Sequence, residues 1–236
     1  MLVECVVRRR FRLQKSAEYP AALVANIENE DNQNAILKRE LAVAMRSLSL
    51  PVPAALLPGE SRFDMGNTDY VFMAGMLDEC VDLHDKRLTV KADLAFCTPW
   101  NNKRLESLMQ MGDPEFKAFL ARDPPSVVKI GVRDGNSLYM LSTNGNHRLF
   151  AAKLRAYSDI PVVCESEVPS LTGMHVTIRS GETFCVGDQG KKMQPKRFKH
   201  DDAIVAAVLS LRGADVETGT GSEPVSKILK DGAIRH

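Results

Sequence analysis

The stretch LSTNGNHRLFAAKLRAYSDIPVVC, residues 141–164, constrains the fold more than any other part of the chain. The apolar run LYMLS (138–142) predicts a strand, and SDIPVV (158–163) predicts a second one. Between them, Gly145 predicts a turn with positive φ. The apolar spacing over residues 147–157 predicts a helix that starts directly after this turn. This order implies a crossover connection and a parallel neighbour for the second strand.

The start of this helix is a candidate anion site. The first N–H groups of a helix have no intrahelical acceptor and carry partial positive charge. Arg148 would add a forked, permanently charged donor and His147 a titratable one. A second interpretation stays open, in which His147 is the polar end of the buried stripe formed with Ala151 and Leu154, and Arg148 pairs with a carboxylate.

The segment NGNHRLFAAKLRAYSDIPVV resembles the motif of the ParB/sulfiredoxin superfamily, in which a strand leads into Gly-x-His/Arg-Arg, a helix with an Ala-Ala pair and an Ile-Pro-Val strand. The matching residues are Gly145, His147, Arg148, Ala151, Ala152, Ile160, Pro161 and Val162. The preceding apolar runs, joined through RDGNS, predict a β-hairpin and fit the order of the family. The resemblance covers residues 127–164.

The resemblance implies that the turn holds the phosphates of a nucleoside triphosphate. By position, the nucleotide-binding residues would be Asn144, Gly145, Asn146, His147 and Arg148. His147 and Arg148 would also be the catalytic residues. ATP or CTP is the expected nucleotide, with Mg²⁺ to neutralise charge on the phosphates. Sulfiredoxins carry a cysteine where this chain has Asn146, so their reductase chemistry is not expected here.

Three functions follow from the resemblance. The first is a ParB-like nucleotide-binding protein that acts on DNA as a nuclease, an NTPase or both, encoded by a plasmid or other mobile element. The second is a non-enzymatic protein that binds a protein partner and inhibits DNA transfer. The third is a small-molecule kinase of the serine-phosphorylating type. Metal ligands are not assigned; Asp134, Glu165 and Glu167 are candidates by sequence proximity alone.

Basic residues gather in two short segments that could contact DNA. They are Arg8, Arg10 and Arg12 near the N-terminus, and Lys191, Lys192, Lys196 and Arg197 further along. If residues 6–13 form a strand, the three arginines project from one face and could follow phosphates. An edge strand that its charges keep from aggregating is an equally good interpretation. The net charge of +1 does not by itself indicate a nucleic-acid-binding protein.

The pattern of elements predicts an α+β fold, with a small mixed sheet built from the hairpin and the strand–loop–helix–strand unit. Residues 1–112 are expected to form a largely helical extension with a basic first strand, 113–212 the core, and 213–236 a flexible linker and short tail. Within the core we expect a helix capped by Asp113, a second hairpin turning at 180–181 and a helix over 201–212.

Composition indicates an ordinary globular chain, with 44% apolar and 26% charged residues. No apolar run approaches the roughly 18 residues of a membrane span, and the N-terminus has the reverse charge order of a secretory signal. We therefore expect a cytoplasmic protein without membrane association. The five cysteines lack the spacing of a zinc site and are expected to be reduced thiols.

Overall fold

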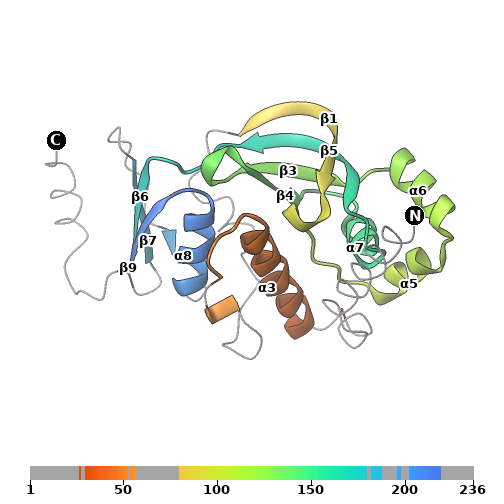
Figure 1. Cartoon of the computed structure of the whole chain (residues 1–236), viewed down its shortest axis with the longest axis horizontal. Coiled ribbons are helices and arrows are strands. Elements are labelled where there is room, and N and C mark those ends of the chain that lie inside the picture. Colours follow the sequence, from red (N-terminus) through yellow and green to blue (C-terminus); the bar gives the residue numbers. More distant parts are fainter. Residues whose placement is uncertain are drawn as a thin grey trace, which may run out of the picture. The chain divides into compact units, whose positions relative to one another are not determined.

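A computed structural model describes residues 27, 30–52, 54–56, 80–179, 182–187, 196–197 and 202–218, and the fold is α+β (Figure 1). The helices are α3 (Glu30–Ser47), α5 (Asn102–Gln110), α6 (Asp113–Arg122), α7 (Asn146–Leu154) and α8 (Asp202–Leu211), with single 3₁₀ turns η1 (Ala54–Leu56), η2 (Ala92–Leu94) and η3 (Arg133–Gly135). The strands are β1 (Val81–Lys91), β2 (Ala95–Phe96), β3 (Ser126–Gly131), β4 (Ser137–Leu141), β5 (Asp159–Val168), β6 (Met174–Arg179), β7 (Glu182–Gly187), β8 (Lys196–Arg197) and β9 (Asp215–Thr218).

The described residues divide into two compact units. The first takes in the described residues up to Val52, together with Val81–Lys129 and Leu138–Glu167. The second takes in the described residues of 53–80, with Ile130–Ser137 and those from Val168 onward. The turn at residues 144–148 therefore belongs to the first unit, as do the described residues that contact it.

The sheet of the first unit has the strand order β1-β5-β3-β4-β2. Strand β5 pairs antiparallel with β1, and β2 pairs parallel with β4. On the other side of β5, Val163 N–H donates to Pro125 O, just before β3 begins. Further along, Lys129 forms an ion pair with Glu167 at 2.6 Å. Both contacts join residues at the same sequence separation, so β3 is the parallel neighbour of β5, while β4 lies one strand further away.

The β-hairpin predicted before the turn is confirmed. Strands β3 and β4 are joined by η3, in which Asp134 and Gly135 have φ values of 60° and 72°. Val132 N–H donates to Asn136 O at 3.1 Å across this turn. An Asp-Gly pair accepts this left-handed geometry readily, because glycine has no Cβ and a short polar side chain tolerates the conformation.

The prediction of a largely helical segment up to residue 112 is wrong for residues 81–96. These residues form β1 and β2, and β1 pairs with β5 along most of its length. The proposed boundary at 112/113 therefore falls inside the first unit. Helix α3 agrees with the helical character expected of this region, and its Ile36, Leu41 and Ala44 are buried.

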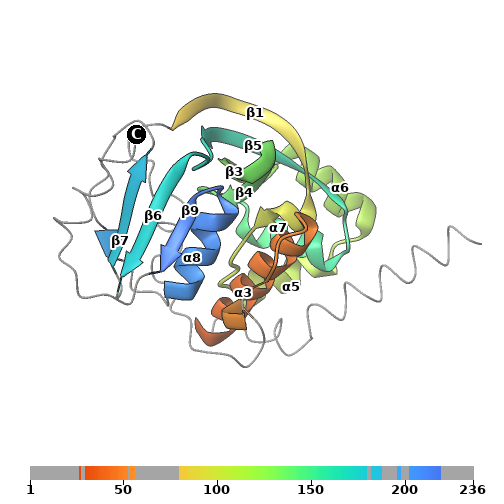
Figure 2. The same cartoon turned by 60° about the vertical axis from the view of Figure 1, so that its left-hand side comes forward.

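Helices α3 and α7 lie on the same side of the sheet (Figures 1 and 2). The core between them contains Ile36 of α3, Phe150 of α7, and Val162 of β5. Helix α5 packs against α7, and Leu105 of α5 joins the same core. Helix α7 is therefore held from several sides, which fixes the position of the turn at its N-terminus.

Helix α6 begins one residue earlier than predicted. Its N-cap is Gly112, and Asp113 is the first helical residue, followed by Pro114. Asp113 was expected to be the cap, but its carboxylate accepts instead from Arg155 at 2.6 Å. The ion pair offers the carboxylate a charged donor, which is a stronger partner than a main-chain N–H at the cap.

The second unit contains a sheet of order β8-β7-β6-β9, with α8 packed against β6 and β9. Strands β6 and β7 form the predicted hairpin, and α8 confirms the predicted helix at 201–212. The linker expected from residue 213 is wrong for Asp215–Thr218, which form β9 and pair parallel with β6. In this pairing His175 Nδ1 lies 3.1 Å from Asp215 Oδ2.

Several expectations concern residues outside those described. The basic strand at 6–13, with Arg8, Arg10 and Arg12, lies outside them, as do Lys191 and Lys192. The backbone of Lys196 and Arg197 forms β8, which pairs antiparallel with β7. Among the helices that the structure describes, none combines the length and the apolar character needed to cross a membrane.

Candidate functional site

The turn before α7 has the backbone geometry that the sequence predicted. Gly145 is the N-cap residue, with φ 100° and ψ 11°, and α7 begins at the next residue. A Cβ at this position would lie 2.5 Å from the Cα of Pro125. The absence of a Cβ at Gly145 therefore allows Pro125, just before β3, to pack closely against the turn. Asn144 O accepts from Ser126 N–H at 2.9 Å, so this turn is tied to the beginning of β3.

Asn146 is buried, with 4% of its surface exposed. Its Nδ2 group donates to the carbonyl oxygen of Thr98, in the segment between β2 and α5. Its Oδ1 atom is buried and has no hydrogen-bond partner among the described residues. A buried acceptor without a donor costs free energy, roughly 1–3 kcal/mol, unless something else donates to it.

His147 faces the same segment and holds its backbone. Nε2 of His147 accepts from Asn101 N–H at 3.0 Å and lies 3.4 Å from Trp100 N. Burial lowers the pKa of His147 below its usual value, and the charge of Arg104 lowers it further. The ring is therefore neutral at pH 7, with Nε2 as an acceptor. In this arrangement His147 acts on the loop before α5 and is not a phosphate donor through Nε2.

Arg148 is buried but reaches a partly exposed partner. Its side chain is 7% exposed, and its guanidinium forms an ion pair with the carboxylate of Asp123, which is 48% exposed. Nη1 also donates to Asp123 O at 2.6 Å, and the guanidinium lies 5.5 Å from the Phe119 ring centre. Burial lowers the pKa of Arg148, although arginine stays charged. This is the carboxylate partner that the second interpretation of the sequence allowed.

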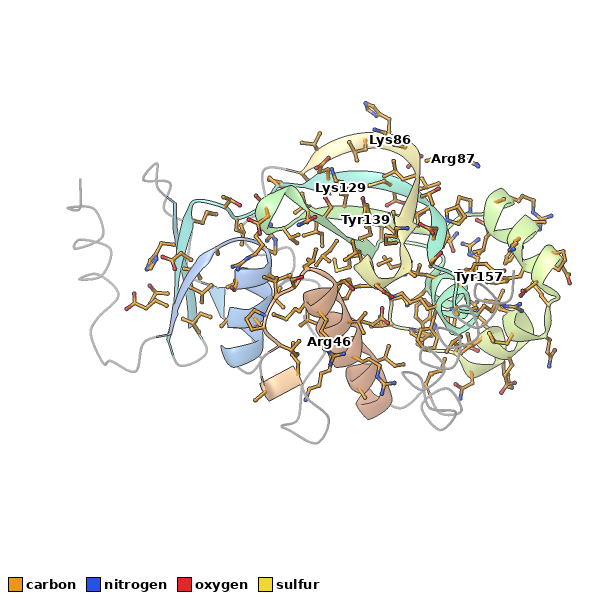
Figure 3. All side chains as sticks on the ribbon, viewed as in Figure 1. Arg46, Lys86, Arg87, Lys129, Tyr139 and Tyr157 are labelled. Atoms are coloured by element: carbon orange, nitrogen blue, oxygen red, sulfur yellow. The ribbon has the colours of Figure 1, made fainter. Side chains whose placement is uncertain are left out.

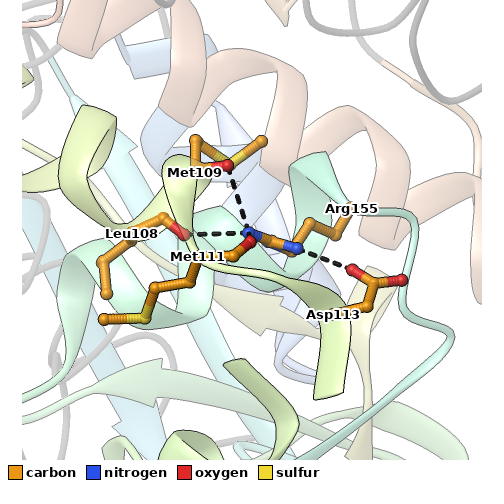
Figure 4. A network of polar contacts seen from close by, with 5 residues as sticks. All are labelled: Leu108, Met109, Met111, Asp113 and Arg155. Atoms are coloured by element: carbon orange, nitrogen blue, oxygen red, sulfur yellow. Dashed lines mark hydrogen bonds and ion pairs between the residues drawn. The ribbon is translucent and has the colours of Figure 1, made fainter. Parts of the chain in front are cut away.

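The other end of α7 is fixed by Lys153 and Arg155. Lys153 forms a buried ion pair with Glu40 of α3. Arg155 donates to three main-chain carbonyls at the end of α5, at 2.9, 3.2 and 2.6 Å, and pairs with Asp113 at 2.6 Å (Figure 4). These contacts connect α7 to α3, α5 and α6, so they determine where the turn at the start of α7 lies.

The candidate metal ligands do not form a cluster in the described part of the chain. Glu165 accepts from the hydroxyls of Ser142 and Thr143, and these hydrogen bonds, that of Ser142 foremost, lower its pKa. Glu167 pairs with Lys129. Asp134 belongs to the hairpin turn of the second unit. Within the described residues, no group of three or more His, Cys, Asp or Glu side chains is placed to hold a metal ion.

The sequence predicts that Asn146, His147 and Arg148 share one turn, but it does not predict the residues that contact them. Thr98, Trp100 and Asn101 precede this turn by almost fifty residues, and Asp123 precedes Arg148 by 25. One local signal was available. Asn101 is the N-cap of α5, and its side chain accepts from Arg104 N–H at 3.0 Å. Such a cap predicts where α5 begins, but nothing local predicts that α5 begins beside α7.

Comparison of the chain with protein-family models, curated proteins and solved structures found no match.

Proposed function

We propose that the chain is a nucleotide-binding protein of the ParB/sulfiredoxin-like kind that acts on DNA, as a nuclease or an NTPase. The order of hairpin, glycine turn, helix and strand supports this proposal. The observation that carries it is the ion pair between buried Arg148 and half-exposed Asp123. In this ion pair the Arg148 guanidinium already stabilises an anion, and a phosphate oxygen can accept hydrogen bonds from the same N–H groups.

The described side chains suggest how a nucleotide would be held. A phosphate would replace the Asp123 carboxylate at Arg148. The unpartnered Oδ1 of Asn146 would accept from a hydroxyl or amino group of the ligand. His147 would act as a positioning residue, because its Nε2 is committed to the backbone before α5. Mg²⁺, when bound, would neutralise charge on the phosphates.

A calorimetric screen of ATP, CTP, GTP and ADP, with and without Mg²⁺, tests whether the site binds a nucleotide. Wild type should bind at least one of these ligands, and Arg148→Gln should weaken that binding at least tenfold. Lys117→Gln is the matched control, since Lys117 is exposed on α6, lies over the Tyr157 ring and should leave the affinity unchanged. Equal affinities for wild type and Arg148→Gln would remove the turn from the proposal.

The DNA-directed part of the proposal needs its own assay. Purified protein with Mg²⁺ should nick supercoiled plasmid, or should hydrolyse the nucleotide identified by calorimetry when DNA is added. Arg148→Gln should lose this activity while its far-ultraviolet circular dichroism stays that of wild type. Cleavage at undiminished rate by the variant would mean that the activity resides elsewhere or comes from a contaminant.

A second candidate function is supported by a different observation. Asn146, His147 and Arg148 are all buried and each contacts another part of the same unit. This arrangement favours a motif that maintains the fold of a non-enzymatic protein-binding inhibitor of DNA transfer. Reduced plasmid transfer from cells that produce the chain, retained in a folded Arg148→Gln variant and without nucleotide binding in vitro, would establish this alternative.

A further inference from the structure

Trp100 is held outward on a well-anchored backbone. It is 51% exposed, whereas the preceding Cys97 and Pro99 are buried. Two contacts with α7 fix this segment, one from Asn146 to the carbonyl of Thr98 and one from Asn101 N–H to His147 Nε2 at 3.0 Å. The exposure of the indole is therefore built into the fold of the first unit.

The indole of Trp100 is only partly covered by its contact with His147. The rings of Trp100 and His147 are 4.7 Å apart between centroids and inclined by 71°, which is an edge-to-face contact. Such a contact uses the edge of one ring and at most one face of the other. It cannot cover both faces of the indole, and about half of the surface of Trp100 is exposed.

Two cations follow Trp100 closely in the sequence. Lys103 and Arg104 are exposed and belong to the first turn of α5. This first turn contains no acidic residue. The charge of Arg104 acts on His147, the ring that Trp100 contacts. Cations at the N-terminal end of a helix oppose the helix dipole, so this turn concentrates positive charge that an anion would neutralise.

Among the described residues, further exposed cations lie on elements other than α5. Arg46 lies on α3, and Lys86 and Arg87 lie on β1 (Figure 3). Trp100 is the single tryptophan of the chain, so its neighbours Lys103 and Arg104 are a distinct combination. An aromatic face with adjacent cations is the arrangement that recognises an unpaired base and the phosphate attached to it.

We propose that Trp100, Lys103 and Arg104 form a binding surface for single-stranded DNA, in which a base stacks on the indole and the cations contact the backbone phosphates. Single-stranded DNA is favoured over a duplex because paired bases keep their faces stacked within the helix. This inference rests on the proposed function insofar as DNA is the substrate. It uses different side chains from the nucleotide turn, so the two can fail separately.

Fluorescence of Trp100 tests the stacking directly. An oligothymidylate should quench the indole emission, and a duplex of the same length should quench it much less. Because Trp100→Ala removes the signal, variants are compared by anisotropy of a fluorescein-labelled oligothymidylate. Trp100→Ala should bind about tenfold more weakly, whereas Met109→Ala, exposed at the far end of α5, should bind as wild type does. Trp100→Phe should keep much of the affinity, which excludes misfolding as the cause.

The cations are tested by salt dependence. The double variant Lys103→Gln/Arg104→Gln should bind more weakly and show a shallower decrease of affinity with salt, by up to about 1.4 in the logarithmic slope. The matched control Lys86→Gln/Arg87→Gln on β1 should keep the wild-type slope.

Four outcomes separate this inference from the proposed function. Quenching by oligothymidylate with weakened binding by Trp100→Ala supports the inference, whether or not Arg148→Gln alters nucleotide binding. Quenching by ATP or CTP alone overturns it and leaves nucleotide binding in place. Oligothymidylate binding that Trp100→Ala does not weaken also overturns it. If neither probe binds and Trp100→Ala instead abolishes capture of a protein, the surface is a protein-docking site and the inference is wrong.

Discussion

The two ends of α7 use similar side chains in different ways. At the C-terminal end, the ion pair between Lys153 and Glu40 is buried on both sides. Arg155 donates to three carbonyls there and also pairs with Asp113, whose side chain is half exposed (Figure 4). At the N-terminal end, Arg148 is as buried as Lys153, but its carboxylate partner Asp123 is half exposed. The Lys153–Glu40 pair can change only if α7 and α3 separate, whereas the carboxylate that pairs with Arg148 can be exchanged at the surface.

This difference separates structural charges from candidate functional ones. A buried cation whose charged partner is also buried, as in the Lys153–Glu40 pair, contributes to the fold, and replacing it should cost stability. A buried arginine whose partner is accessible can accept another anion without unfolding. Burial of the cation alone therefore does not distinguish the two cases; exposure of its partner does.

The largest expected effect comes from Lys153. Lys153→Ala should lower the free energy of unfolding by about 3–5 kcal/mol, because it leaves the Glu40 carboxylate buried without its cation. Urea unfolding followed by circular dichroism measures this. The double variant Glu40→Gln/Lys153→Met should be more stable than Lys153→Ala, since it removes both buried charges together. A decrease in the free energy of unfolding below about 1 kcal/mol in Lys153→Ala would contradict the importance of this buried ion pair for stability.

Arg155→Gln should be the next most destabilising change, by about 2–4 kcal/mol, because charge-assisted bonds to carbonyls at the end of α5 disappear together. Arg155→Lys should recover part of this loss, since an ammonium replaces the charge but not the forked geometry. Thermal unfolding gives the ranking. If Arg155→Lys were as stable as wild type, the forked geometry of the guanidinium would contribute nothing to stability.

At the N-terminal end, His147 should make stability depend on pH. Its pKa is lowered in the folded state, so the unfolded chain binds more protons between the two pKa values. The contribution is fully present above about pH 6.5 and is lost as the pH falls through the lower, folded pKa. Urea unfolding between about pH 8 and pH 5 should show a decline that His147→Gln reduces. His175→Gln, on β6, is the histidine control; an unchanged decline in His147→Gln would contradict this assignment.

The smallest effect concerns the residue that follows Arg155. Ala156 has φ 58°, which costs energy for any residue with a Cβ, and it ends α7 in the left-handed conformation. Ala156→Gly should stabilise the fold by about 0.5 kcal/mol, after the greater entropy of glycine in the unfolded chain is subtracted. By contrast, Ala118→Gly in the middle of α6 should destabilise the fold by about 1 kcal/mol.

Local signals in the sequence predicted most elements correctly. The Asp134-Gly135 pair predicted the hairpin between β3 and β4, and Gly145 predicted the positive-φ turn before α7. Both predictions depend on conformations that few other residues accept. In each case the determining residue lies within the element it defines.

Strands β1 and β9 were missed because neither has a regular apolar alternation. Strand β1 is mostly exposed and charged, and β9 has the sequence DVET. Their pairing partners, β5 and β6, lie far away in the sequence. The site shows the same limit, since Arg148 was predicted to face an anion but Asp123 could not be named from sequence. Pairings over such distances depend on how the helices pack, which no short pattern encodes.

The central claim is that Arg148 holds an exchangeable anion, and calorimetry of the Asp123→Asn variant tests it most directly. Removing the competing carboxylate leaves the buried Arg148 guanidinium without its charged partner, while its bond to the main-chain oxygen of residue 123 remains. We expect Asp123→Asn to bind ATP or CTP about tenfold more tightly than wild type does. Adding Arg148→Gln should abolish this gain in affinity. Nucleotide binding that is absent in both wild type and Asp123→Asn, with both proteins folded, would contradict it.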